Sequence, residues 1–492
     1  MIKPLRILIA AILACFACLV IAPKAWAFCG FYVAKADAKL YNQASQVALA
    51  RNGNKTILTM ANDYQGEVKD FAIVVPVPVV LKQEQVRIAN PKVIERLDAF
   101  SAPRLVEYFD PDPCPPPYEE GMLYDRAAQA PAAVPAPASK VSNEALGVTI
   151  EEQFTVGEYD ILILSAKESD GLETWLVQNG YKIPQGARNL LKPYIRQKLK
   201  FFVAKVNLAE FDKAGFQNLR PIQISYESPR FMLPIRLGMV NAQNAQDLLV
   251  YVLSANGQAE VTNYRTVKVP TDAEIPVFVK DTFSYFYKDM FQTAYAQEGK
   301  NVAFLEYFWN MANCDPCSAD PLNPEELREA GVFWLDYPQP RGAVPANPFP
   351  VAAPPTPVPD PAPGAPSVSR PAPMPIAPPR PPFPVSSNVY ITRLHVRYTR
   401  DKFPEDLTFQ ETNNQASFQG RYILRHAFTG KAECPAGRDY VRSLPRRFEQ
   451  EAQTLARLTG WNIQDIRRKL PRVPVASSWW EQLVGAVSRF WS

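Results

Sequence analysis

Two cysteines separated by two residues are the most suggestive chemical group in this chain. Cys314 and Cys317 stand in the order Cys-Asp-Pro-Cys. A thiolate with a lowered pKa attacks disulfides, so this spacing indicates either a thiol-disulfide exchange site or a structural bridge. The pair follows an aromatic segment and precedes Pro321 and Pro324, without the βαβ unit of a thioredoxin-like site, which favours the structural bridge.

The chain has two histidines, His395 and His426. Zinc binds thiolates and imidazoles, so the histidines and the cysteine pair are a conceivable metal site. However, both histidines fall on separate predicted strands far along the chain, and neither has a second cysteine pair at zinc-finger spacing. We therefore predict satisfied or surface histidines, with no metal and no cofactor.

Pairs of acidic residues are the remaining candidates for catalysis. Asp110 with Asp112, and Glu119 with Glu120, could act as acid and base on glycans, but solvated turn carboxylates are commoner. The sequence contains no G-x-S-x-G, no H-E-x-x-H and no P-loop motif. We therefore favour a non-enzymatic binding or structural protein, with a thiol-disulfide exchange protein and a cell-envelope hydrolase as alternatives.

The first 27 residues have the features of a cleavable signal peptide. Lys3 and Arg6 precede an uncharged apolar run at residues 7–22, and the small-x-small triplet at residues 25–27 follows. The run is roughly 16 residues, shorter than the ~20 that span a bilayer as a helix. We predict cleavage before Phe28 and a location in the periplasm or outside the cell.

Five cysteines remain after this cleavage. They are Cys29, Cys114, Cys314, Cys317 and Cys434. In an oxidising compartment they should mostly pair, and the odd number leaves at least one thiol over or pairing between chains. The count does not determine the connectivity.

The C-terminal residues 477–492 carry aromatic and aliphatic side chains at helical spacing. These are Trp479, Trp480, Leu483, Val484, Val487 and Trp491. Because Arg467, Arg468, Lys469 and Arg472 precede them, the segment suits an anionic membrane surface or another envelope component. Docking of the apolar stripe on the protein itself is equally compatible. The net charge of +4 is too small for the size of the chain to indicate a nucleic-acid partner.

Composition divides the mature chain into four regions. We predict that residues 28–335 form a β-rich α+β domain, interrupted by a flexible alanine- and proline-rich segment at 127–139. Residues 336–385 form a proline-rich linker or insertion. Residues 386–476 contain strands and helices that we expect to pack on the main domain, because two strands alone are marginally stable. The aromatic segment 477–492 follows.

Local signals predict individual elements. Asn52-Gly53 joins strands at 45–51 and 55–61 into a hairpin, and an apolar run at 70–80 extends it into a β-meander. Further strands are predicted at 230–238, 389–398 and 420–428. Helices are predicted at 91–101, 279–296, 444–459 and 463–470.

Several residue runs resemble a known family. They include Phe28-Cys29-Gly30-Phe31-Tyr32-Val33, Thr59-Met60-Ala61-Asn62-Asp63-Tyr64, Asn313-Cys314-Asp315-Pro316-Cys317 and the stretch from Gly420 to His426. These runs are similar to those of exported bacterial proteins grouped as domain of unknown function 2330. The resemblance extends over nearly all of the mature chain on both sides of the proline-rich stretch, which favours an insertion. It implies no activity, substrate or catalytic residue.

Overall fold

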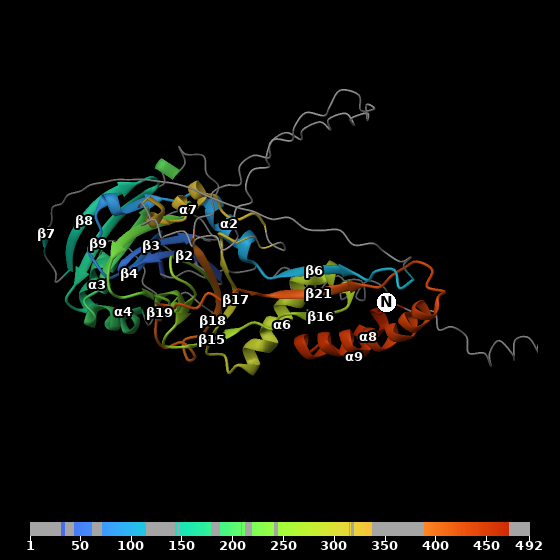
Figure 1. Ribbon diagram of the computed structural model, residues 1–492. Helices are drawn as coiled ribbons and strands as arrows, with labels where there is room; N and C mark the ends of the chain where they lie inside the picture. Colours follow the sequence, from blue (N-terminus) through green and yellow to red (C-terminus); the bar gives the residue numbers. More distant parts are fainter. Residues whose placement is uncertain are drawn as a thin grey trace, which may run out of the picture.

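The computed structural model describes the chain in separate stretches. These are residues 31–34, 44–61, 71–114, 143–144, 148–178, 187–207, 209–211, 219–240, 245–313, 315, 319–336 and 388–471. Within them the chain forms two large β-sheets, two three-stranded sheets and several helices (Figure 1). The predicted α+β class with a β-rich core is confirmed.

The largest sheet combines strands from distant parts of the chain. Its order is β15 (Arg265–Lys268), β17 (Val302–Asn310), β18 (Tyr390–Tyr398), β13 (Gln246–Ser254), β2 (Ala44–Asn52), β3 (Lys55–Ala61), β11 (Ile222–Glu227) and β5 (Val86–Ile88), and β20 (Phe418–Gln419) pairs with β17. β2 and β3 form the predicted hairpin, in which Gly53 adopts a φ of 58°. β18 follows the proline-rich stretch in sequence yet lies between β17 and β13.

A second sheet packs on the first and completes a β-sandwich. Its order is β1 (Phe31–Ala34), β4 (Phe71–Val77), β10 (Lys200–Val206), β9 (Tyr159–Ala166), β8 (Val148–Val156) and β7 (Asn143–Glu144). The predicted β-meander is wrong: β4 does not pair with the hairpin of β2 and β3 but lies in this second sheet, between β1 and β10. The reason is burial on both faces: Ile73 and Val75 point into the sandwich, whereas Val74 faces the helices outside it.

Helices cover the outer faces of both sheets. α3 (Ser169–Gln178) and α4 (Ala187–Arg196) pack on the smaller sheet. α2 (Pro91–Ser101) and α7 (Pro324–Glu329) cover one part of the larger sheet, and α6 (Phe283–Gln297) covers a neighbouring part. The predicted helix 91–101 is confirmed, and the side chain of Asn90 caps it by accepting a hydrogen bond from the backbone N–H of Lys92.

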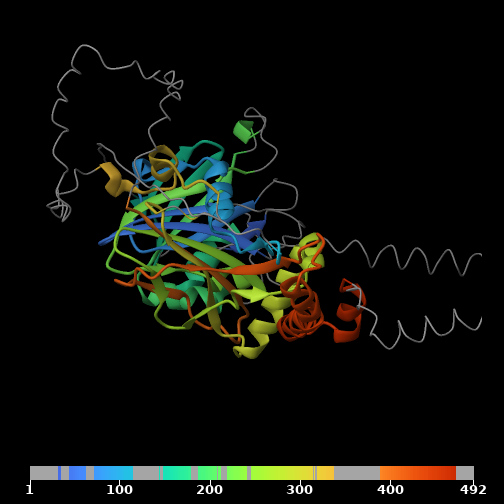
Figure 2. The same ribbon diagram turned by 45° about the vertical axis from the view of Figure 1, so that its right-hand side comes forward.

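An arm projects from the sandwich. It consists of the parallel strands β16 (Ala273–Glu274), β21 (Arg421–His426) and β6 (Arg104–Phe109), together with α8 (Pro435–Thr459) and α9 (Ile463–Lys469). The two helices, red in Figure 2, stand apart from the blue and green strands of the sandwich. α6 links the two parts, since it packs on α8 and places Phe286 and Met290 against Tyr422 of β21.

A disulfide between Cys114 and Cys434 closes the far end of the arm. Their Cα atoms are 6.0 Å apart, although the residues are separated by 320 positions in sequence. Cys434 is also the N-cap of α8, which begins at Pro435 and not at 444 as predicted. Pro445, which usually disrupts a helix, lies inside α8 and accounts for this error.

Other predictions also need correction. The strand predicted at 230–238 is reduced to β12 (Met232–Leu233), because Pro234 cannot continue a hydrogen-bonded ladder, and the 3-10 helix η2 (Arg236–Val240) follows. β17, a long strand beside β18, was not predicted. No helix in the described stretches is long and apolar enough to cross a lipid bilayer.

Candidate binding cleft and the ion-pair network behind it

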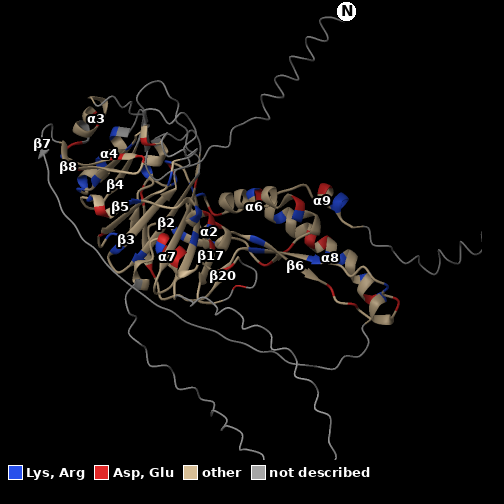
Figure 3. Cartoon of the chain, turned by 90° about the horizontal axis from the view of Figure 1, so that it is seen from above, with Lys and Arg blue, Asp and Glu red and all other residues tan. Residues whose placement is uncertain are grey.

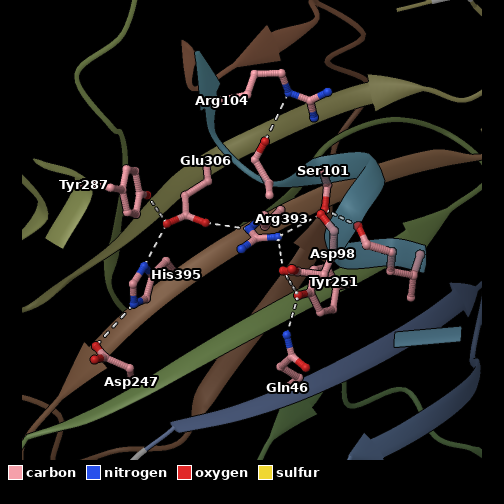
Figure 4. Close-up of polar contacts among 12 residues, drawn as sticks. Gln46, Asp98, Ser101, Arg104, Asp247, Tyr251, Tyr287, Glu306, Arg393 and His395 are labelled. Carbon is pink, nitrogen blue, oxygen red and sulfur yellow. Dashed lines mark hydrogen bonds and ion pairs between the residues drawn. The ribbon is translucent and has the colours of Figure 1, made fainter. Parts of the chain in front are cut away.

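Three alternate residues of β18 place cations on one face of the larger sheet. Arg393, His395 and Arg397 share this face because successive side chains of a strand point to opposite sides. Asp247 of β13 lies directly opposite Arg397 in the sheet register. A β-bulge in β17, between Leu305 and Tyr307, brings Glu306 to the same group. Figure 4 shows the polar contacts of this cluster. α2 and α6 flank it, since Asp98 of α2 contacts Arg393 and Phe291 of α6 stacks on His395.

Glu306 is the centre of this network. Its side chain is fully buried, and its Oε2 accepts a hydrogen bond from Nε of Arg393 at 2.6 Å. Its Oε1 lies 2.7 Å from Nδ1 of His395 and also accepts the hydroxyl of Tyr287. The other ring nitrogen of His395 lies 3.2 Å from Asp247 Oδ1. The imidazole therefore bridges two carboxylates (Figure 4).

The electrostatic environment keeps these groups ionised. Burial by itself raises the pKa of Glu306, but the charges of His395 and Arg393 outweigh it and lower that pKa to about 2. Burial by itself lowers the pKa of His395, but Glu306 and Asp247 raise it to about 8. For Asp247, His395 and Arg397 outweigh burial and hold the pKa well below its usual range. At neutral pH, His395 is consequently a cation between two anions.

The network continues inward to α2 and β2. Nη1 of Arg393 donates to Oδ1 of Asp98 at 2.6 Å, and the hydroxyl of Tyr251 donates to the same oxygen at 2.8 Å. Nε2 of Gln46 in turn donates to the Tyr251 hydroxyl at 3.1 Å. The chain of contacts thus fastens both α2 and α6 to the sheet. Because both nitrogens of His395 are engaged with carboxylates, the ring holds a charge in place and offers no free lone pair as a base.

A cleft of about 470 Å³ opens at the outer end of the network. On its floor, Arg397 binds Asp247 through Nε at 2.6 Å and Nη2 at 2.7 Å, and its Nη1 donates to Gln292 at 2.6 Å. Lys300 and Lys402 line it together with Asp401, which is largely exposed. The lining thus contains three cations and two carboxylates, an arrangement suited to holding a small polar ligand.

The structure places the predicted cysteines in two groups. Cys114 and Cys434 form the disulfide of the arm, whereas Cys29, Cys314 and Cys317 lie outside the described residues. Asp315, inside the Cys-Asp-Pro-Cys motif, is described. It is buried, and its Oδ2 accepts hydrogen bonds from Tyr307 at 2.9 Å and from Gln419 at 2.8 Å. The middle of the motif is therefore attached to β17 and β20.

The two histidines are not neighbours. His426 lies in the arm, where its Nε2 is 2.7 Å from Glu107 and its ring stacks on Phe109 at 4.4 Å. In the part of the chain that the structure describes, no three histidine, cysteine or acidic side chains gather in a metal-binding arrangement.

The predicted acidic pair of the arm has structural contacts. Asp110 accepts hydrogen bonds from Tyr440 at 2.6 Å and Arg447 at 2.5 Å, and Asp112 accepts one from the backbone of Cys114 at 2.8 Å. These contacts order the loop that carries the disulfide. The other predicted residues fall outside the described stretches, namely Glu119, Glu120, Trp479, Trp480, Leu483, Val484, Val487 and Trp491.

Sequence reasoning missed most of the network. Glu306, Asp247, Arg393 and Arg397 were not identified as a group. The available signal was the alternation of Arg393, His395 and Arg397 on a predicted strand, since three cations on one sheet face require carboxylates if that face is covered. The alternation does not, however, identify which carboxylates pair with these three cations.

Comparison with known proteins identifies a family. Residues 23–410 match the family described as uncharacterized protein conserved in bacteria, DUF2330. The match ends within β19 (Leu407–Glu411), so β21, α8 and α9 lie beyond it. No curated protein and no solved structure matches the chain significantly. Because the matched range covers well over half of the 492 residues, the chain belongs to this conserved bacterial family, DUF2330.

Proposed function

We propose that the protein is exported and acts outside the cytoplasm as a non-enzymatic binding component of the bacterial envelope. The export part of the proposal is supported by the leader-like first 27 residues and by the bridge between Cys114 and Cys434. Disulfides persist in oxidising compartments and are rare in the cytoplasm. The sandwich and its arm would therefore mature where thiols oxidise.

One observation carries the binding part: an open cleft lies directly over a fixed ion pair. Arg397 and Asp247 are held in place by Gln292 and His395, so the floor of the cleft is ordered before any ligand arrives. A preorganised site loses less entropy on binding. Because cations outnumber carboxylates in the lining, the cleft favours a small anionic ligand with carboxylate or phosphate groups.

Calorimetry with succinate and inorganic phosphate tests this role. We expect at least one of these anions to bind, and the double variant Lys300→Ala/Lys402→Ala to bind it at least tenfold more weakly. Lys288→Ala is the matched control, because Lys288 is exposed on α6 but does not line the cleft. Absence of binding by the wild type, or equal affinity in the double variant, would contradict the proposal.

N-terminal sequencing and disulfide mapping of the native protein test export. We expect sequencing to begin at Phe28 and a non-reducing digest to contain a peptide linked through Cys114 and Cys434. Recovery of Met1, or of Cys114 as a free thiol, would argue against export. The same digest addresses the thiol-disulfide exchange alternative, which requires a mutual Cys314–Cys317 bridge that is easily reduced.

A further inference from the structure

A second concave surface lies in the arm. This arm groove, of about 390 Å³, runs between α9 on one side and α6 with the 3-10 helix η3 (Val277–Thr282) on the other. Phe278 and Tyr285 line one wall, and Trp461, Ile466 and Lys469 line the other. Tyr285 is 68% exposed. A large aromatic side chain left exposed beside other apolar groups indicates a surface that another apolar group covers.

The walls of the arm groove are held in place by their own contacts. The indole Nε1 of Trp461, between α8 and α9, donates to Asp289 on α6 at 2.7 Å, which holds the ring against α6. The ammonium of Lys469 lies 5.3 Å from the centre of the Phe278 ring. Ile466, in the same wall as Trp461, is only 2% exposed. The groove is therefore preformed, and its lining combines aromatic and aliphatic side chains with one cation, Lys469, and one carboxylate, Asp465.

A segment of matching character follows the groove in the chain. The described residues end at Pro471, shortly after Lys469. Residues 477–492 carry one apolar stripe at helical spacing: Trp480, Leu483, Val484, Val487 and Trp491. The connection of about nine residues between 471 and 480 can extend roughly 30 Å, so the stripe is within reach. Tethering raises its effective concentration at the groove to about the millimolar range.

The cations next to the groove are already engaged within the protein. Nη2 of Arg467 lies 2.5 Å from Glu449, and Arg468 pairs with Asp465. Acidic and basic side chains both occur on α8 and α9 (Figure 3). These pairings weaken the attraction of this face for anionic lipid, whereas the apolar lining remains available. The observations therefore favour an apolar protein segment over a membrane as the occupant.

We propose that the arm groove binds the chain's own residues 477–492. Their apolar stripe covers Phe278 and Tyr285 and completes the core of the arm. This inference is independent of the proposed ligand cleft and of export, since it involves neither the residues of the cleft nor the compartment.

Photo-crosslinking within the full-length protein tests the proposal. We would replace Tyr285 with p-benzoylphenylalanine, irradiate at low protein concentration and identify the linked peptides by mass spectrometry. The expected product is an intramolecular link to residues 477–492. The same amino acid at Tyr108, an aromatic position of β6 that is 42% exposed, is the control and should not link to that segment.

Two double variants show whether the stripe itself is responsible. Leu483→Ser/Val487→Ser removes apolar groups from the stripe and should reduce the yield of the link at least fivefold. Gln482→Ser/Arg489→Ser alters the opposite helical face and should leave the yield unchanged. Two results would overturn the proposal: no link to the segment, or a link found only at twice the mass of the chain. In the first case, segment-dependent sedimentation on phosphatidylglycerol vesicles would identify a membrane as the occupant instead.

Discussion

Glu306 and Arg393 form an ion pair of 2.6 Å at a depth that water hardly reaches. The carboxylate is fully buried, and the arginine side chain is 6% exposed. A buried charge is stable only while its partner remains, because an uncompensated charge in the interior costs several kcal/mol. This pair and its neighbour His395 therefore determine how the protein responds to mutation and to pH.

Arg393→Met should destabilise the protein by about 3–5 kcal/mol, because it leaves Glu306 and Asp98 without their guanidinium partner. Urea unfolding measures the change. Arg265→Met is the matched control: Arg265 pairs with Glu298 in an exposed position, and its loss should cost less than about 1 kcal/mol. Equal costs for the two variants would refute the importance of the buried pair.

The stability of the protein should fall as the pH rises from about 6.5 to about 8. Glu306 and Asp247 stabilise the protonated His395 and raise its folded pKa to about 8, whereas the unfolded chain releases this proton near 6.5. The unfolded state thus binds fewer protons across this window, and about 2 kcal/mol is lost. Urea titrations at several pH values should show this slope in the wild type and in His426→Gln, but not in His395→Gln.

Glu451→Gln should stabilise the arm at pH 8. Glu451 on α8 is 3% exposed, and burial raises its pKa to about 7 despite the neighbouring Arg447. The folded state therefore keeps a proton that the unfolded state releases near 4.5, so stability is lost as the pH rises from about 4.5 to about 7. The neutral glutamine avoids this loss and should gain about 1–2 kcal/mol. Glu449→Gln, which removes an ion pair with Arg467, should give no gain in the same unfolding experiment.

Gly331→Ala should cost about 2–4 kcal/mol, because the position combines two obstacles. Gly331 adopts a φ of 97°, and a Cβ there would lie 2.7 Å from the side chain of Ile57 in the hairpin. Gly460→Ala separates the two effects, since Gly460 also has a positive φ, 73°, but nothing lies within 4 Å of an added Cβ. That control should cost only about 1–2 kcal/mol, and thermal unfolding compares the pair. A larger loss for Gly460→Ala would contradict the packing argument.

The elements that sequence predicted well are those with local signals. Asn90 and Pro91 mark the start of α2, and Asn52-Gly53 marks the hairpin turn, because caps and turns depend on neighbouring residues alone. β17 was missed for the opposite reason. Glu306 interrupts its apolar run, and the arginine that makes this charge tolerable lies 87 positions further along the chain.

The order of the strands also depends on contacts that no local pattern records. β2 pairs in parallel with β13, and β21 pairs in parallel with β6, across hundreds of residues in each case. The candidate cleft shares this property, since Asp247, Gln292 and Arg397 come from three separate elements. The sequence pattern therefore predicts cations on one face of β18, but it does not predict which other residues line the cleft.

The position of β18 has a consequence for the timing of folding. Until residues 390–398 have been synthesised, β13 and β17 lack the strand that joins them, and each presents an open edge. Open edges recruit wrong partners, and sheets built from distant segments form slowly. The larger sheet is therefore completed only after the residues on both sides of the proline-rich stretch have been synthesised.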